Sequence, residues 1–252
     1  MIIAIANQKG GVGKTTTAVN LSASLAAAGK KTLLVDFDPQ ANASSGLGIR
    51  FTEKEPTIYD YLTGKKTFKE TVVHIQDLPE LNLLPAFRNL ARVIVELDGN
   101  GDSHRHLRSK LADIASNYEY VLIDCPPSLG LLTLNALAAA DKVIIPIQCE
   151  YYALEGLGQA LVTLARIQKT CNPGLRLLGV LMTMYDARLN LSNQVLKEVK
   201  SYFGKRVFDT MIHRNVRLAE SPSFDKPVIM YDSKSRGAVN YIELAEEIID
   251  GR

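Results

Sequence analysis

The 252-residue sequence has few cysteines, and they lie far apart. Its three cysteines, Cys125, Cys149 and Cys171, form no Cys-x-x-Cys pair, and their number is odd. A disulfide framework and a structural zinc site are therefore not expected, and a reducing cytoplasm is the simplest environment for the chain. We expect the three side chains to be small buried hydrophobic groups.

The sequence also lacks a large charge excess and a long apolar run. Its formal net charge is +2, so the overall balance predicts neither a nucleic-acid nor a membrane partner, and any basic surface must be local. The apolar run at residues 2–6 has no basic residue before it and ends at Asn7, Gln8 and Lys9. It is too short for a signal peptide or a membrane span, so it predicts a first buried strand.

Internal repeats, low-complexity segments and Pro/Ser-rich linkers are absent as well. Instead, short apolar runs alternate with helical patterns, which predicts a doubly wound α/β fold with a mostly parallel sheet and helices on both faces. The predicted strands are 2–6, 32–36, 81–84, 120–124, 142–147 and 177–182, and the predicted helices are 15–28, 107–115, 131–140, 154–168, 192–203 and 241–249. We expect one domain over residues 1–252, with an exposed polar loop at 98–103.

The segment between the first predicted strand and helix carries the clearest chemical signal. It reads Gln8-Lys9-Gly10-Gly11-Val12-Gly13-Lys14-Thr15-Thr16. Three glycines in four residues let the backbone point successive N–H groups into a concavity at a helix N-terminus, where the helix dipole favours anions. Lys14 would place its ammonium on the β- and γ-phosphates, and the Thr15 hydroxyl would ligate Mg²⁺. Residues 10–16 therefore predict a site for ATP and Mg²⁺.

Acidic residues follow two of the predicted strands. Asp36 and Asp38 come at and just after the end of 32–36, and Asp124 ends 120–124. The carboxyl ends of neighbouring parallel strands meet in one crevice with the phosphate loop. Carboxylates at that place hold Mg²⁺ through its waters or orient an attacking water. We expect Thr15, Asp124 and Asp36 at the metal.

The loop departs from the ordinary P-loop pattern, which has a glycine where this chain has Gln8, and it carries a second lysine, Lys9. In this form it resembles the deviant Walker A motif of the ParA/MinD ATPases, a group of P-loop NTPases. The resemblance implies that Lys9 reaches across a dimer interface to the partner's nucleotide and that the active form is an ATP-bound homodimer. It also implies that Asp38 positions the hydrolytic water, so Asp38, Lys9 and Lys14 are the expected catalytic residues.

Four longer strings, at 36–48, 124–136, 146–156 and 215–223, resemble chromosomal ParA (Soj-type) proteins and occur in the same order. The resemblance implies a DNA-segregation ATPase whose ATP-bound dimer binds double-stranded DNA nonspecifically. A ParB-type centromere-binding partner would stimulate hydrolysis and release the dimer. The implied location is cytoplasmic and nucleoid-associated.

The resemblance also implies which residues contact the nucleotide and which contact DNA. Met184, His213 and Asn215 are expected to contact the nucleotide; relatives commonly have proline where this chain has His213, which either stacks on a base or is simply packed. Residues 185–236 contain ten basic and six acidic residues, a local charge of +4 that suits phosphate contacts. By resemblance, the candidate DNA-binding residues are Arg188 and Arg217, followed by Arg214 and Arg236.

Three rival readings have less support. A MinD-like membrane ATPase ends in a basic amphipathic helix, whereas the segment from residue 237 onward has four acids and one base. An iron–sulfur reductase needs cysteines in a pattern that Cys125 and Cys149 do not show. The same switch acting on a protein assembly remains an alternative, because cargo is not encoded in the motifs. The phosphate loop begins at residue 9, so no N-terminal helix-turn-helix domain is expected.

Overall fold

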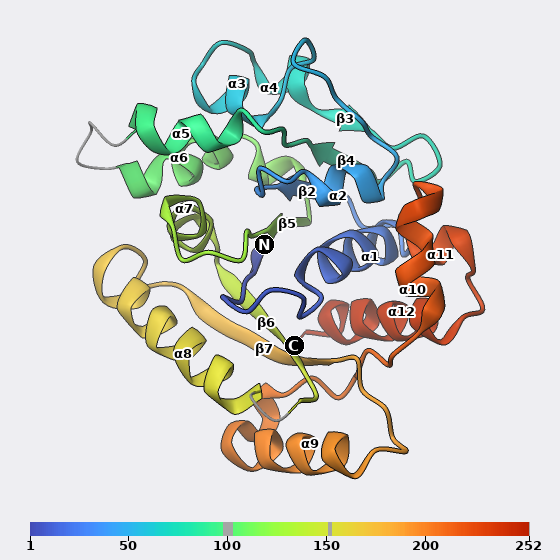
Figure 1. Cartoon of the computed structure of the whole chain (residues 1–252). Helices are drawn as coiled ribbons and strands as arrows, with labels where there is room; N and C mark the ends of the chain where they lie inside the picture. The colour runs from blue at the N-terminus through green and yellow to red at the C-terminus, as the bar shows by residue number, and fades with distance from the viewer. Residues whose placement is uncertain (98–102, 151–152, 252) are drawn as a thin grey trace.

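The computed structural model of the chain describes residues 1–97, 103–150 and 153–251, with a seven-stranded sheet at its centre (Figure 1). The strand order is β3-β4-β2-β5-β1-β6-β7, and β3, which is antiparallel to β4, is the exception in an otherwise parallel sheet. The strands are β1 (Ile2–Ile5), β2 (Thr32–Asp36), β3 (Val73–His74), β4 (Leu81–Leu84), β5 (Tyr120–Asp124), β6 (Lys142–Gln148) and β7 (Arg176–Thr183).

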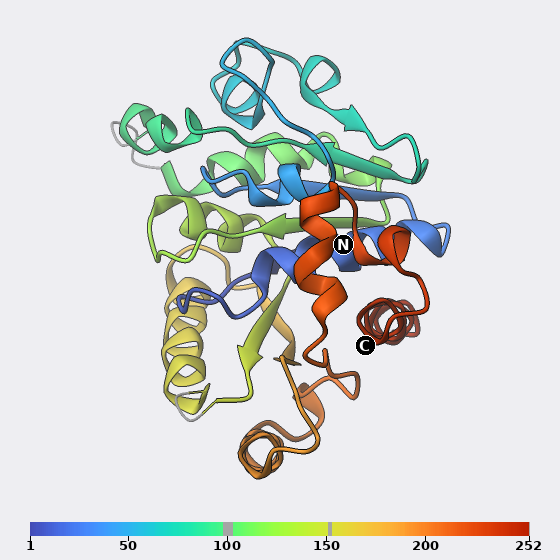
Figure 2. The same cartoon turned by 45° about the vertical axis from the view of Figure 1, so that its right-hand side comes forward.

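Helices cover both faces of this sheet, as Figures 1 and 2 show from two directions. They are α1 (Lys14–Ala27), α2 (Asn42–Gly46), α3 (Ile58–Leu62), α4 (Phe68–Thr71), α5 (Leu90–Leu97), α6 (His106–Ala112), α7 (Leu131–Ala139), α8 (Ala153–Thr170), α9 (Asn190–Phe203), α10 (Val216–Glu220), α11 (Val228–Tyr231) and α12 (Arg236–Ile249). Helices α1, α11 and α12 lie on one side of the sheet, and α6, α7 and α8 lie on the other (Figure 1).

Each face of the sheet has its own hydrophobic core, because successive side chains of a strand point to opposite faces. In β1, Ile3 and Ile5 belong to the core under α1 and α12, whereas Ala4 belongs to the core under α7 and α8. Both sets are fully buried, which explains why this strand reads as a continuous apolar run rather than an alternating one.

The strand register brings the functional segments to one edge of the sheet. Ile5, the last residue of β1, is paired with Asp124, and Asp36 is paired with the same aspartate from the other side. At the neighbouring strands, Gln148 at the end of β6 is paired with Thr183 at the end of β7. The phosphate loop leaves β1 at this edge, so side chains from four other strand ends surround it.

The predicted fold class is confirmed, and the six predicted strands and six predicted helices are present with ends shifted by a few residues. Helix α1 ends next to Gly29, whose φ of 78° suits a glycine after a helix C-terminus. The largest shift is in α12, which begins at Arg236 rather than at residue 241. The sequence did not predict β3 or the short helices α2 to α5, α10 and α11.

Two further sequence expectations concern residues 98–102 and the membrane. The polar loop expected at 98–103 lies, apart from Ser103, outside the described residues. Within the described ranges, no helix has both the length and the apolar content that a membrane crossing requires. Helix α12 packs its apolar side, including Tyr241, Leu244 and Ile248, into the protein core.

Candidate active site

The phosphate loop connects the end of β1 to the start of α1, with Gly11 and Gly13 in the left-handed region at φ 74° and 87°. Only glycine adopts these angles without strain. Gly13 is also the N-cap of α1 and offers no side-chain cap, so the first N–H groups of the helix stay available. In the described part of the chain, the N–H groups of Gly10, Gly11, Val12 and Gly13 donate to no other residue. The loop is therefore a concavity of unpaired donors at a helix N-terminus, which suits a phosphate group.

Lys14 lies across this concavity. Its ammonium donates to the Lys9 carbonyl oxygen at 3.1 Å, and the residue is 7% exposed. Burial lowers the pKa of the Lys14 ammonium, and the carboxylates of Asp124 and Asp38 partly offset this effect. Lys14 is thus a buried cation held by one loop carbonyl, in a position to contact phosphates bound at the loop.

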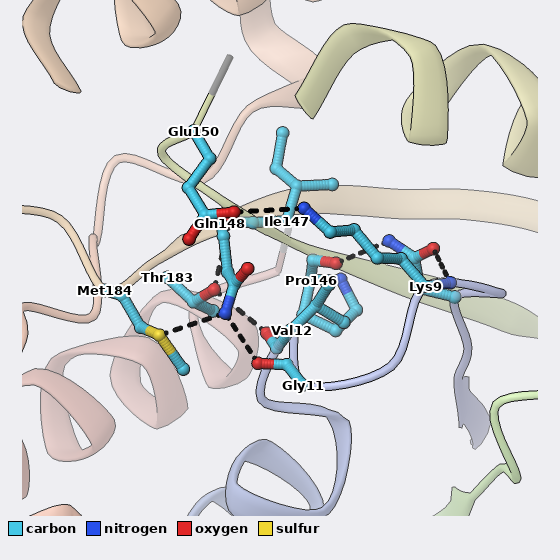
Figure 3. Close-up of polar contacts among 10 residues, drawn as sticks. Lys9, Gly11, Val12, Pro146, Ile147, Gln148, Glu150, Thr183 and Met184 are labelled. Atoms are coloured by element: carbon cyan, nitrogen blue, oxygen red, sulfur yellow. Dashed lines mark hydrogen bonds and ion pairs between the residues drawn. The ribbon is translucent and has the colours of Figure 1, made fainter. Parts of the chain in front are cut away.

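Lys9, at the start of the loop, makes one hydrogen bond through its backbone N–H and one ion pair through its ammonium. Its N–H donates to Asn7 Oδ1 at 3.0 Å, and Asn7 in turn donates to the Pro146 carbonyl at 2.8 Å. The Lys9 ammonium forms an ion pair with Glu150 Oε2 at 3.1 Å (Figure 3). In the single chain, the lysine that is expected to cross a dimer interface is therefore paired within its own protomer.

Asp124 is a fully buried carboxylate at the end of β5. Neither oxygen has a partner that meets hydrogen-bond geometry among the described residues, although the Thr15 hydroxyl is near enough to lower its pKa. Burial, and then the neighbouring carboxylate of Asp36, raise the pKa of Asp124 well above its ordinary value. A buried carboxylate is seldom left unpaired in a native protein, so this one indicates a site for a cation.

Asp36 and Asp38 differ from Asp124 because their carboxylates accept hydrogen bonds from other protein groups. Asp36 Oδ2 accepts from the Ser44 N–H and hydroxyl at 2.8 and 2.7 Å, and its pKa is raised by burial to about 6. These bonds tie the start of α2 to the end of β2. Asp38 is 8% exposed, and its Oδ1 accepts from the Gln40 N–H at 2.9 Å. Asp36 thus holds α2 in place beside the site, while Asp38 lies at the same edge.

These groups fit magnesium and a polyphosphate together. Mg²⁺ prefers oxygen ligands and in phosphate sites uses one or two protein groups, with waters and phosphates completing the shell. The free carboxylate of Asp124 and the hydroxyl of Thr15 supply such ligands beside the unpaired N–H groups of the loop. Within the described ranges, no cluster of three or more His, Cys, Asp or Glu side chains that could hold a metal occurs.

An open pocket adjoins the loop on the side of β7. It is lined by Gly13, Thr16, Thr183, Met184, Ile212, His213, Arg214, Asn215, Leu218, Ala219 and Tyr241. The predicted nucleotide-binding residues Met184, His213 and Asn215 all line it, as does Thr16 of the loop. Its position next to the phosphate site and its mainly apolar lining suit a nucleobase.

His213 is held by a network at the rim of this pocket. Its Nδ1 lies 2.9 Å from Asn240 Oδ1, and its Nε2 lies 2.7 Å from an Arg236 nitrogen. Because a guanidinium only donates, Nε2 accepts and Nδ1 carries the hydrogen, which defines a neutral tautomer. The ring also meets Tyr185 edge-on, with centroids 5.2 Å apart. The structure thus packs His213 into a hydrogen-bonded network while leaving it on the pocket's edge.

A β-bridge between Tyr185 and His213 brings two segments together beside this pocket. Of the predicted DNA-binding arginines, Arg188 follows the first segment, and Arg214 and Arg217 follow the second. Arg214 lines the pocket, and Arg236 binds His213. The other two form ion pairs on the surface. Arg188 makes two bonds to Asp186, of 3.0 and 2.7 Å. Arg217 lies 2.8 Å from Glu220 and 3.3 Å from Asp232.

Sequence reasoning missed three side chains that bind the phosphate loop or its lysine: Gln148, Glu150 and Thr183 (Figure 3). Each lies at or just after the end of a parallel strand next to the loop. The criterion that selected Asp124, a polar residue at a buried strand's carboxyl end, would also have selected Gln148 and Thr183.

The comparisons with known proteins agree with this geometry. Residues 1–177 match the family model described as an AAA domain. The chromosome partitioning protein ParA of Myxococcus xanthus is 52% identical over 248 residues, which are 98% of this chain and 87% of that protein. The sporulation initiation inhibitor protein Soj of Bacillus subtilis is 53% identical over 247 residues, which are 98% of this chain and 97% of that protein.

A solved structure is similar over nearly the same length. The crystal structure of cobyrinic acid a,c-diamide synthase from Mycobacterium smegmatis, with bound ADP and magnesium, has a TM-score of 0.85 and 37% identity. The match covers 98% of this chain and 93% of that one. With full-length relatives at about half identity and a P-loop site of the expected architecture, the chain belongs to the ParA/Soj family of chromosome-partitioning ATPases.

Proposed function

We propose that the protein is an ATP-driven dimerising switch for DNA segregation, acting in the cytoplasm on the nucleoid. The observation that carries this proposal is the loop itself, in which unpaired N–H groups, the buried Lys14 and the unpaired Asp124 converge while a second lysine, Lys9, stands at its edge. An ordinary phosphate loop needs only one lysine. The second one forms an exposed ion pair with Glu150 rather than a contact with the phosphate-binding N–H groups, which leaves it available for a role in a partner's site.

Each residue has a distinct part in the proposed cycle. The N–H groups of 10–16 and the Lys14 ammonium bind the phosphates of ATP, and the pocket beside Met184 takes the base. Thr15 and Asp124 hold Mg²⁺ directly or through its waters; when bound, the metal neutralises charge on the phosphates. Asp38, the neighbouring carboxylate whose Oδ1 accepts from the Gln40 N–H, orients the attacking water.

Dimer formation requires Lys9 to leave Glu150 and to reach the nucleotide of the second protomer. Two protomers then present two sets of arginines, and linking two weak DNA contacts raises the affinity through effective concentration. Arg188, Arg217, Arg214 and Arg236 contact DNA phosphates without reading bases. Hydrolysis, stimulated by a ParB-type partner, removes the γ-phosphate contacts and separates the protomers.

The test is binding to nonspecific duplex DNA with ATP, with ADP and without nucleotide, over a salt series. The Asp38→Ala variant slows hydrolysis and keeps the ATP-bound state. We expect the protein to bind DNA with ATP but not with ADP or without nucleotide. The affinity for DNA should fall steeply as the salt concentration rises, because phosphate contacts release counterions. If no state binds DNA while ATP still drives dimerisation, the switch acts on a protein or membrane cargo instead. If ATP drives no dimerisation, the proposed switch is wrong.

A further inference from the structure

The polar groups of the phosphate loop are largely segregated: among the described residues the N–H groups of Gly10 to Gly13 have no acceptor, whereas most of the loop's carbonyl groups accept a hydrogen bond. Four carbonyl oxygens of this segment accept a hydrogen bond, those of Lys9, Gly11, Val12 and Gly13, and no described residue donates to that of Gly10. Lys14 caps Lys9 and the helix caps Gly13. The caps on Gly11 and Val12 come from outside the loop, and no sequence motif identifies them.

Gln148 caps Gly11. Its Nε2 donates to the Gly11 carbonyl oxygen at 2.7 Å and also lies 3.1 Å from Met184 Sδ (Figure 3). A carbonyl oxygen accepts only from a donor, so the amide must present its NH₂ end to the loop. Met184 has φ 51°, a left-handed conformation unusual for its type, and lines the base pocket. Gln148 therefore joins the phosphate loop to the residue beside the base.

Thr183 caps Val12. Its buried hydroxyl lies 2.9 Å from the Val12 carbonyl oxygen and 3.0 Å from that of Ile147. The single hydroxyl hydrogen is shared between these two acceptors or points to one of them. The threonine methyl lies 3.7 Å from the position that a Cβ on Gly13 would take, so the side chain lies beside Gly13 as well.

The two caps form one unit, because Gln148 and Thr183 are register partners at the ends of the adjacent strands β6 and β7. If either cap were lost, the freed carbonyl group would turn toward water or toward the phosphate site. A peptide plane that rotates a carbonyl inward also rotates an N–H outward. Where the freed carbonyl turns inward, the lost cap therefore replaces a donor to the phosphates with a repelling oxygen.

We propose that Gln148 and Thr183 are positioning residues for ATP hydrolysis, which keep the N–H groups of the loop directed at the phosphates by capping the carbonyl groups behind them. This inference rests on the proposed binding of ATP at the loop. Neither side chain acts on the reacting atoms; both act through the loop backbone, and Gln148 also links the loop to the base pocket.

The test uses variants that keep shape and remove the donor. Gln148→Met and Thr183→Val lack the capping hydrogen, and Thr183→Ser restores it. Matched controls exist elsewhere in the fold. Gln168 Nε2 donates to the Leu175 carbonyl at 2.7 Å, and Thr63 donates to the Tyr59 carbonyl at 2.9 Å, so Gln168→Met and Thr63→Val remove bonds of the same kind.

The measurements are the affinity for a fluorescent ATP analogue with Mg²⁺, the KM and kcat of ATP hydrolysis, and the unfolding temperature without nucleotide. We expect Gln148→Met and Thr183→Val each to weaken binding and raise KM roughly two- to ten-fold, the range for one hydrogen bond, with a smaller change in kcat. Thr183→Ser should restore the affinity. The controls should lower the unfolding temperature without changing KM.

The outcomes separate this inference from the proposed function. If the parent protein does not bind the ATP analogue, ATP binding at the loop is wrong. Suppose instead that the parent binds the analogue, and that Gln148→Met and Thr183→Val bind it as tightly as the controls Gln168→Met and Thr63→Val do. Gln148 and Thr183 then only stabilise the fold, and the positioning role is wrong. A Thr183→Ser variant as weak as Thr183→Val would overturn the role of the hydroxyl.

Discussion

The ion pair between Lys9 and Glu150 predicts that removing the Glu150 carboxylate makes dimerisation easier. The two side chains lie 3.1 Å apart in the single chain, whereas the proposed dimer needs the Lys9 ammonium at the partner's nucleotide. Each protomer must therefore break one such pair. The Glu150→Gln variant keeps the shape of the side chain and removes the charge, so Lys9 starts out free.

The size of the effect follows from the exposure of the pair. The Lys9 and Glu150 side chains are 36% and 50% exposed, so solvent screens their attraction. Pairs of this kind contribute about 0.2–1 kcal/mol each. Two pairs break per dimer, which gives about 0.4–2 kcal/mol, or about a two- to thirty-fold lower dimer dissociation constant for the variant. The difference should shrink as salt rises.

Sedimentation with ATP, in the Asp38→Ala background, measures the dimer dissociation constant. Glu119→Gln is the matched control, because Glu119 pairs with Lys30 at 3.2 Å with exposed fractions of 48% and 32%. We expect a tighter dimer for Glu150→Gln and no change for Glu119→Gln. Unchanged or weaker dimerisation of Glu150→Gln would refute the reasoning. In a Lys9→Ala background, Glu150→Gln should have no effect.

Three more predictions concern protons, DNA and thiols. Since burial raises the pKa of Asp124, a proton competes with Mg²⁺ for this carboxylate. Mg·ATP affinity should therefore fall as the pH is lowered, and titration calorimetry at several pH values should show that Asp124→Asn removes this part of the pH dependence. Arg188 lowers the pKa of Asp186 to about 2, so this aspartate is charged in any DNA assay; Asp186→Asn should tighten DNA binding a few-fold, Arg188→Ala should reduce the salt slope by about one, and equal slopes would argue against contact with DNA. Burial raises the pKa of Cys149 to about 12, so a disulfide reagent at pH 8 should rapidly modify Cys171 alone, and rapid modification of a second thiol in the folded protein would contradict the structure.

The sequence predicts those parts of the site whose residues are neighbours along the chain or end a buried strand. The phosphate loop is one continuous segment, and Asp124 ends an apolar run, so both are visible without coordinates. The short helices between residues 42 and 97 are too brief for an apolar period to stand out, and tertiary contacts stabilise them instead.

Apolar periodicity and local motifs do not predict side-chain contacts between residues that are far apart in the sequence. The network around His213 depends on Arg236 and Asn240, which lie 23 and 27 positions further along the chain. The ion pairs of Arg188 and Arg217 show the same limit, because charge counting finds the arginines but not the acids that hold them. Side-chain partners are set by packing, which a single sequence does not specify.

Strand β1 lies between β5 and β6 in the sheet, so it cannot pair with a neighbour until those later strands have been synthesised. Ile5 pairs with Asp124 on one side and Ile144 on the other, so β1 is synthesised more than a hundred residues before either of its neighbouring strands. Such distant pairings are slow to close. Because Thr183 also caps the loop, the phosphate site of a growing chain is complete only after β7 has been synthesised.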